Sequence, residues 1–187
     1  MQQLLEYGAD AIAFEALVLA GDNSALCHGH SRRNYKIKKG DSLLFDFGAT
    51  VNGYHSDITR TFFINNVSDK DKNMYDIVLK ANKLGRNIAK PGLSMHSLDD
   101  QVLKVLEESE YKDFVVHKTG HGLGMDVHED PYIMRDNFEK LENGMVITIE
   151  PGLYNQNNLG IRIEDDVLIT KDGCRSLTTF DRELRLI

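Results

Sequence analysis

Acidic residues in two separate segments are the residues of this 187-residue chain best suited to chemistry. Asp46 and Asp57 bracket the segment DFGATVNGYHSD, and Glu150 and Glu164 bracket EPGLYNQNNLGIRIE. His121 lies between them, in TGHGLG. Each acidic pair encloses a Gly- or Asn-rich turn between runs typical of β-strands, so each predicted hairpin brings two carboxylates together. This pattern predicts a metal site.

The charge of such a site requires compensation. Four ionised carboxylates held together inside a fold repel one another and lose hydration, which costs several kcal/mol each unless positive charge is present. Two divalent cations supply that charge. Carboxylates with one imidazole and no thiolate suit Mn²⁺, Co²⁺ or Zn²⁺, and we expect Mn²⁺ first. Any one of these acids alone would be an ordinary surface residue. Four acids and one histidine in this arrangement favour the metal site.

Strand periodicity predicts which side chains share the site. Side chains on a strand alternate between its two faces. In the first segment Asp57 therefore shares a face with Thr59 and Thr61. In the second, Arg162 and Glu164 share a face, and the apolar residues occupy the opposite one: Ile161, Ile163 and Val167. We expect both polar faces to turn inward, although an Arg in this position is also commonly paired with a neighbouring acid.

Four segments closely resemble the catalytic domain of Xaa-Pro aminopeptidases and prolidases, the proline-specific branch of the pita-bread metallopeptidases: DFGATVNGYHSDITRTF, GHGLGMDVHEDP, GMVITIEPGLY and GIRIEDDVLIT. The resemblance runs from about Gly21 to Phe180. It implies an α+β pita-bread (creatinase/aminopeptidase) fold, in which a pseudo-twofold curved antiparallel sheet is covered by helices. It also implies two bound divalent ions and hydrolysis of the bond before proline, at the N-terminus of peptides or in Xaa-Pro dipeptides.

The resemblance also assigns roles to individual residues. It implies five metal ligands: Asp46, Asp57, His121, Glu150 and Glu164. Asp57 and Glu164 would bridge both ions. Three histidines would bind the substrate and handle protons: His28, His117 and His128. Tyr154 and Arg162 would contact the ligands from outside the metal site. Glu150 would pass a proton to the leaving nitrogen, and His128 or His117 would stabilise the oxyanion.

Two other functions compete with this interpretation. Methionine aminopeptidases share the five ligands and often a segment like Cys27-His28-Gly29, but the runs 57–61 and 160–165 resemble the proline branch. Some pita-bread domains are non-catalytic binding modules that have lost their metal, and the intact ligand set argues against that here. The remaining histidines match no catalytic motif, and we expect His96 to be a solvated residue at a helix start.

Composition favours one domain, residues 1–187, with a single core, because 41% of the residues are apolar. A net charge of −7 and a pI near 5.5 argue against nucleic acid as a partner. Two cysteines, no signal peptide and no 18-residue apolar run predict a cytoplasmic protein without a membrane partner. The resemblance implies a peptide substrate with proline in second position.

Local signals place the elements that carry these residues. Strands are predicted at about 15–19, 42–48, 115–117, 146–150 and 161–169, with a primed turn at Asn52-Gly53. Helices are predicted at 69–89, capped by Ser68, and at 93–108. Residues 1–10 resemble the tail of a helix, so we expect the chain to lack the family's first helix and N-terminal domain. That domain contributes to subunit contacts and substrate access, so we expect a homodimeric parent and inefficient catalysis by this chain alone.

Overall fold

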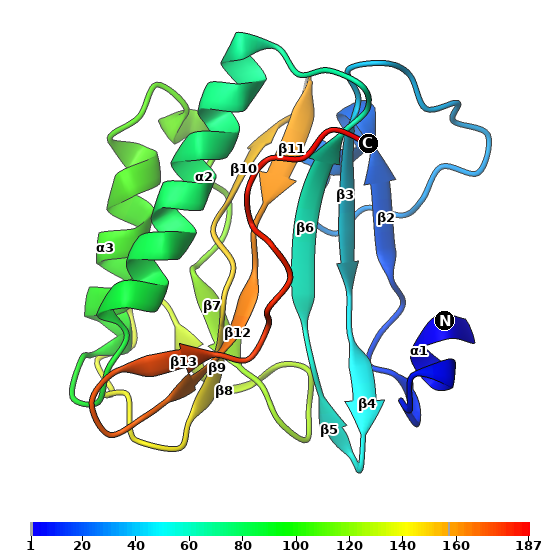
Figure 1. The fold of residues 1–187 in the computed structure, drawn as a ribbon. Helices are drawn as coiled ribbons and strands as arrows, with labels where there is room; N and C mark the ends of the chain where they lie inside the picture. The colour runs from blue at the N-terminus through cyan, green and yellow to red at the C-terminus, as the bar shows by residue number, and fades with distance from the viewer. Residues whose placement is uncertain (1, 157) are drawn as a thin grey trace.

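The computed structural model describes residues 2–156 and 158–187. Met1 and Asn157, which belong to the predicted helix tail and to the turn of the second predicted hairpin, lie outside the described residues. The elements follow in this order (Figure 1): α1 (Gln2–Glu6), β1 (Ala11–Ile12), β2 (Leu17–Ala20), the 3-10 helix η1 (Gly21–Ala25), β3 (Ser42–Phe47), β4 (Ala49–Val51), β5 (Tyr54–His55), β6 (Ile58–Phe63), α2 (Asp69–Ile88), α3 (Met95–Glu107), the 3-10 helix η2 (Lys112–Phe114), β7 (Gly120–Gly122), β8 (Glu129–Ile133), β9 (Val146–Ile149), β10 (Gly152–Asn155), β11 (Leu159–Arg162), β12 (Asp165–Ile169) and β13 (Cys174–Ser176).

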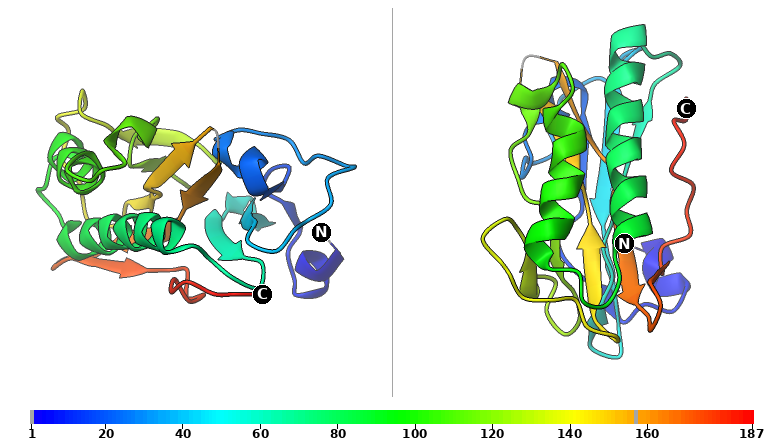
Figure 2. Two further views of the ribbon diagram at one scale, coloured as in Figure 1. Left: turned by 90° about the horizontal axis from the view of Figure 1, so that it is seen from above. Right: turned by 90° about the vertical axis from the view of Figure 1, so that its left-hand side faces the viewer.

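The strands form antiparallel sheets that lie next to one another. One has the order β2-β3-β6 and another has the order β13-β12-β9-β7-β8, with the short sheets β1-β4-β5 and β10-β11 beside them. All named pairings among the described residues are antiparallel. Helices α2 and α3 cover the half of the molecule that holds β9 to β12. No long helix of the described residues lies over β2, β3 and β6 (Figures 1 and 2). The predicted α+β class and antiparallel architecture are confirmed.

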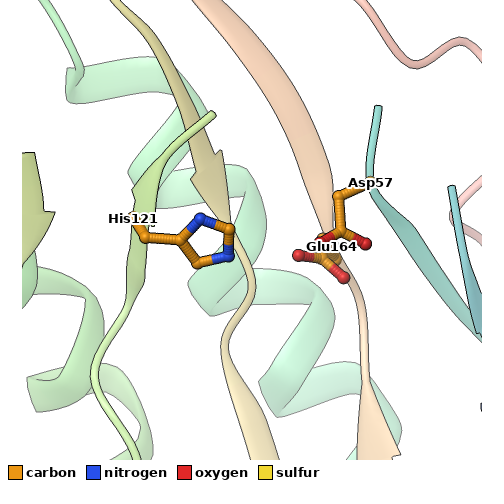
Figure 3. Close-up of side chains that lie close together, drawn as sticks. All are labelled: Asp57, His121 and Glu164. Carbon is orange, nitrogen blue, oxygen red and sulfur yellow. The ribbon is translucent and has the colours of Figure 1, made fainter. Parts of the chain in front are cut away.

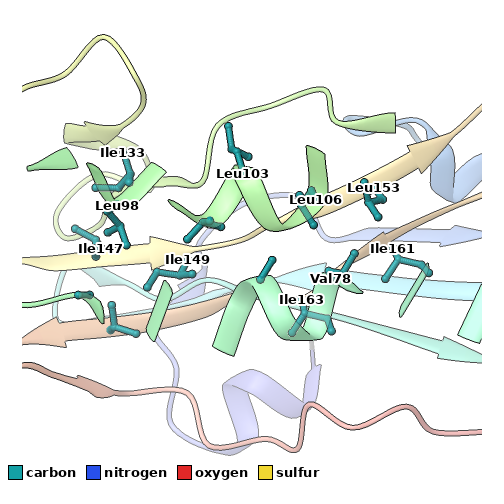
Figure 4. Close-up of a cluster of buried hydrophobic side chains, with 14 of the residues drawn as sticks. Val78, Leu98, Leu103, Leu106, Ile133, Ile147, Ile149, Leu153, Ile161 and Ile163 are labelled. Atoms are coloured by element: carbon teal, nitrogen blue, oxygen red, sulfur yellow. The ribbon is translucent and has the colours of Figure 1, made fainter. Parts of the chain in front are cut away.

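The main core lies between the two long helices and the strands beneath them. Apolar residues recur along α2 and α3 at helical spacing and pack on β9, β10 and β11 (Figure 4). The approach is close at Gly85 of α2, where an added Cβ would lie 2.8 Å from Ile149 Cγ2. Ser68 and Ser94 cap the two helices by accepting main-chain N–H groups. This packing fixes the strands that carry half of the candidate site.

The first hairpin has the predicted turn. Asn52 and Gly53 both have positive φ, 51° and 80°, as the primed turn requires. The register of β3 and β6 places Asp46 opposite Thr59. No helix among the described residues is long and apolar enough to cross a bilayer.

The predicted strand at 115–117 is wrong. Val115 ends the 3-10 helix η2, and Val116 is exposed despite its β-branched side chain. The strand forms instead at Gly120–Gly122, where β7 pairs with β8 and β9. Glycine permits this position, because an added Cβ at Gly120 would lie 2.1 Å from Thr148 O. Close approach between neighbouring backbones outweighed local strand propensity.

The single strand predicted at 161–169 is divided. Strand β11 ends at Arg162 and pairs with β10, whereas β12 begins at Asp165 and pairs with β9 and β13. Glu164 lies in the break, where its N–H donates to Thr59 O at 3.1 Å. A contact with the first hairpin therefore interrupts the ladder. The environment of His96 also differs from the prediction, because its ring is half-buried and stacks on Phe138 with centroids 4.7 Å apart.

Candidate metal centre

A cavity of about 250 Å³ lies where the two acid-bearing segments meet. Its walls include all five predicted ligands and four further predicted site residues: Asp46, Asp57, His121, Glu150, Glu164, His28, His117, His128 and Arg162. These residues come from β3, the loop after η1, the position directly before β6, and the loops and strands between 117 and 164. The tertiary structure therefore brings together residues that are more than one hundred positions apart in the chain.

The tightest cluster in the cavity contains Asp57, His121 and Glu164. One ligand atom from each lies within 4.8 Å of the others, and all three residues are buried. The imidazole of His121 reaches from β7 towards the two carboxylates, which lie directly before β6 and β12 (Figure 3). Glu150 joins this cluster, with its Oε1 3.4 Å from His121 Nε2. The donor set is oxygen-rich with one nitrogen.

The cavity contains carboxylate oxygens that the protein leaves unsatisfied. Oδ1 of Asp46 and Oδ1 of Asp57 are buried without a hydrogen-bond partner among the described residues. Such atoms are costly to bury and are normally paired. A divalent cation would satisfy both. The residues present therefore fit a hard or borderline divalent metal.

His121 is oriented as a neutral metal ligand requires. Its Nδ1 lies 2.9 Å from Gly122 O, and because a carbonyl only accepts, Nδ1 carries the proton. Burial lowers the pKa of His121 to about 4, so the ring is neutral near pH 7. Nε2 then presents a lone pair to the cavity. This arrangement fixes the tautomer of a candidate ligand.

The acids of the cavity hold protons more tightly than ordinary acids. Burial, reinforced by the charges of Asp46 and Glu150, raises the pKa of Asp57 to about 9. Burial raises the pKa of Glu150 to about 7, against the opposing effect of Arg162. Burial and the neighbouring acids also raise the pKa of Glu164 well above its usual value. Metal binding must displace these protons, so affinity is expected to rise with pH.

Arg162 lies behind the cavity and connects several of its walls. It is 3% exposed, forms an ion pair with Asp46 and donates from Nε to Thr59 Oγ1 at 3.0 Å. Burial opposes its charge, but Tyr154, Asp46 and Glu164 together raise the pKa of Arg162 well above its usual value. The ion pair is with an acid of the first hairpin. The inward orientation predicted for Arg162 is therefore present.

Tyr154 does not line the metal cavity but connects two residues that do. Its hydroxyl accepts from Arg162 Nη1 at 2.7 Å and lies 2.8 Å from His117 Nε2. His117 Nδ1 lies 2.7 Å from Lys118 O, so Nδ1 is protonated and Nε2 accepts from the tyrosine. Burial lowers the pKa of His117 to about 4. Both ring nitrogens of His117 are therefore already paired.

His128 stands next to the ligand cluster. Its ring centroid is 4.2 Å from that of His121, and both rings line the cavity. Burial lowers the pKa of His128 from its usual value. No hydrogen bond within the described part of the protein ties its ring nitrogens to another group. His30 and His55 do not line this cavity, and His55 instead pairs with Thr50 Oγ1.

The sequence patterns missed several residues at the cavity. Phe14 and Leu17 line it and supply apolar surface, and Lys118 lines it beside His117. Leu17 pairs with Asp46 across β2 and β3, a register that no local signal specifies. Thr59 was placed on the polar face but given no role, although its hydroxyl bonds both Arg162 and Glu164. Alternation along the strand was the only signal for it.

The fold and the donor set together define a pita-bread domain with a candidate divalent-metal site. The model of metallopeptidase family M24 matches residues 1–171, and the chain belongs to that family. A Xaa-Pro dipeptidase from Pyrococcus furiosus is 42% identical over 177 residues, which cover 95% of this chain and 51% of that protein. The chain thus spans about half the length of the curated relatives it matches.

Solved structures agree with this assignment. The prolidase from Pyrococcus furiosus matches with a TM-score of 0.92 at 41% identity, over 95% of this chain and 52% of that one. The X-Pro aminopeptidase from Thermotoga maritima matches with a TM-score of 0.93 at 39% identity, over 98% of this chain and 51% of that one. The pita-bread resemblance predicted from four sequence segments is confirmed.

Proposed function

We propose that the protein carrying this chain hydrolyses the peptide bond before proline, with two divalent ions held by five ligands: Asp46, Asp57, His121, Glu150 and Glu164. The observation that carries this proposal is the convergence of these donors on one cavity, with buried carboxylate oxygens left unpaired. Mn²⁺ is our first expectation for both ions, and Co²⁺ and Zn²⁺ suit the same donors. The names of similar proteins supply the substrate class.

The bound ions would polarise the scissile carbonyl and lower the pKa of water to near neutrality. The proton movements fall to the protein. Glu150 lines the cavity beside His121, where a carboxylate can take up a proton and pass it to the leaving nitrogen. The leaving nitrogen of any peptide bond must gain a proton to depart as an amine, and before proline that nitrogen carries no hydrogen of its own.

Of the two histidines considered for the oxyanion, the geometry favours His128. Both ring nitrogens of His117 are already paired, whereas His128 lines the cavity next to His121. A neutral imidazole keeps one N–H to donate to a developing negative charge. We assign His117, Tyr154 and Arg162 to holding the wall of the cavity. His28 also lines the cavity, and we assign it to substrate contact.

The alternatives make different predictions. A methionine aminopeptidase would share the ligands, but the relatives described above are named for dipeptidase, prolidase or X-Pro aminopeptidase activity. A binding module of the same fold would not need a loaded metal pair. The homodimer, which the resemblance implies, and the cytoplasmic location, which the composition favours, stay predictions. The sequence does not choose between dipeptides and longer peptides.

The test uses the full protein that carries residues 1–187, stripped of metal and reloaded with Mn²⁺, Co²⁺ or Zn²⁺. Hydrolysis of Ala-Pro, Ala-Pro-Ala, Ala-Ala and Met-Ala-Ala is measured together with the metal content. We expect cleavage only before proline, with two metals per chain. His121→Ala serves as the control and should lose both metal and activity. Cleavage of Met-Ala-Ala in preference would identify a methionine aminopeptidase, and a metal-free inactive protein would identify a binding module.

A further inference from the structure

The two proposed bridging ligands both lie in breaks between strands. Asp57 stands between β5 and β6, and Glu164 stands between β11 and β12. The regular ladder of main-chain hydrogen bonds that fixes a residue within a sheet is interrupted at both places. Other contacts must therefore set where these two carboxylates lie relative to each other.

Those contacts run reciprocally between the two segments. The N–H of Asp57 donates to Oδ2 of Asp166 at 3.0 Å. The carbonyl of Glu164 accepts from Nη1 of Arg60. Asp166 lies two positions after Glu164 and bonds the main chain of Asp57. Arg60 lies three positions after Asp57 and bonds the main chain of Glu164. Both are buried, with 3% and 5% of their surface exposed.

Arg60 is itself held in one orientation. Its Nη2 pairs with Asp165 Oδ1 at 2.8 Å and donates to Phe180 O at 2.8 Å, while Nε donates to Asp181 O at 3.0 Å. Asp165 is fully buried and also pairs with Arg182 at 2.8 Å. The guanidinium that bonds Glu164 thus has little freedom to move.

The buried carboxyl of Asp166 is not explained by a contribution to the stability of the fold. Its Oδ1 is buried without a partner among the described residues, and its Oδ2 accepts a hydrogen bond from the N–H of Asp57. A buried carboxyl with a single hydrogen bond is destabilising compared with an apolar residue. Its contact therefore points to a role in holding Asp57.

We propose that Asp166 and Arg60 are positioning residues that set the separation of Asp57 and Glu164 and so the affinity of the cavity for metal. This inference rests on the proposed metal centre. Groups that hold a metal ligand in place commonly account for 10- to 100-fold in metal affinity. Neither residue touches the metal pair in this scheme; each acts through a main-chain atom of a ligand.

Two substitutions of Asp166 separate this role from a general effect of charge. Asp166→Ala removes the acceptor for the Asp57 N–H, whereas Asp166→Asn keeps an oxygen in its place. Co²⁺ affinity is measured by titration, and the absorption spectrum of the Co²⁺-loaded protein reports ligand geometry. We expect the Ala variant to bind Co²⁺ about 10- to 100-fold more weakly with a changed spectrum, and the Asn variant to stay within about threefold of wild type.

Arg60→Lys gives an independent measurement, because a lysine keeps a positive charge near Asp165 but cannot reproduce the fork of donors. We expect the same weakening of Co²⁺ binding. Asp172→Ala, at an exposed acid after β12, is the matched control and should bind as wild type does. Thermal melts establish that each variant is folded.

The outcomes separate the two proposals. A wild-type protein that binds no Co²⁺ rejects the metal centre itself. Wild-type binding with an unaffected Ala variant, or with Ala and Asn variants impaired equally, rejects the positioning role alone. If neither Asp166→Ala nor Arg60→Lys folds, the two residues serve the fold, and the positioning role is likewise rejected.

Discussion

Replacing Glu150 by Gln should stabilise the metal-free protein, and the gain should depend on pH. Glu150 has a pKa of about 7 in the folded protein and 4.5 as its usual value. Below pH 4.5 the carboxyl is protonated in both the folded and unfolded states and has no charge to bury. As pH rises towards 7 the unfolded state loses its proton first, so the free energy of unfolding falls.

The size of the effect follows from the two pKa values. The difference between 4.5 and about 7, at about 1.4 kcal/mol per pH unit, corresponds to roughly 3 kcal/mol lost by the wild type above pH 7. Gln has no proton to lose and keeps a similar shape. For a chain of this length, roughly 3 kcal/mol corresponds to about 6–12 °C in Tm. Removing the charge at position 150 also relieves Asp57, whose pKa it helps to raise.

The assay is urea unfolding with a chelator present, at pH 4.5 and at pH 8, for the wild type, Glu150→Gln and a control. Glu139→Gln is the control because Glu139 is an exposed acid outside the cavity. We expect Glu150→Gln to exceed the wild type by about 3 kcal/mol at pH 8 and to match it at pH 4.5. Adding Mn²⁺ should reverse the order at pH 8, because ligand binding stabilises only the protein that retains its ligands.

A difference between Glu150→Gln and the wild type that is the same at both pH values would refute the reasoning. It would mean that the substitution acts through packing and that the carboxyl of Glu150 is not destabilised by burial. Equal stabilisation by Glu139→Gln would show that net charge, and not the cavity, is responsible.

Three further outcomes are expected in the full protein. His128→Ala should lower kcat about 10²- to 10³-fold with metal content unchanged, whereas His121→Ala should lose metal as well. If His128→Ala preserves kcat per folded molecule, His128 has only a structural role. Tyr154→Phe should lower the free energy of unfolding in urea by about 1–3 kcal/mol, because Arg162 Nη1 and His117 Nε2 lose the hydroxyl that both of them bond. An unchanged free energy of unfolding would mean that water replaces the hydroxyl. Mn²⁺ affinity should rise between pH 6 and pH 8 as the raised-pKa acids of the cavity release protons; a flat profile in calorimetry would contradict those pKa values.

Local sequence signals predicted much of the fold because they report local physics. Ser68 precedes a helix whose apolar residues recur at helical spacing, and both the cap and the buried face are present in α2. Asn52-Gly53 gives the primed turn because both residues tolerate positive φ. The four acids and the histidine motif indicated a metal site because unpaired buried charge requires compensation.

The sequence by itself thus determined the residue types of the candidate centre, the family resemblance and several of the elements that carry the site, but not β7, which carries His121. Only the tertiary structure decided how those elements meet. The break at Glu164 arises because its backbone bonds Thr59 and Arg60 of the other segment, contacts that no local pattern contains. The position of Asp57 depends in the same way on Asp166, which lies 109 residues further along the chain. Such contacts depend on sheet register and on burial, which arise only when distant segments pack together.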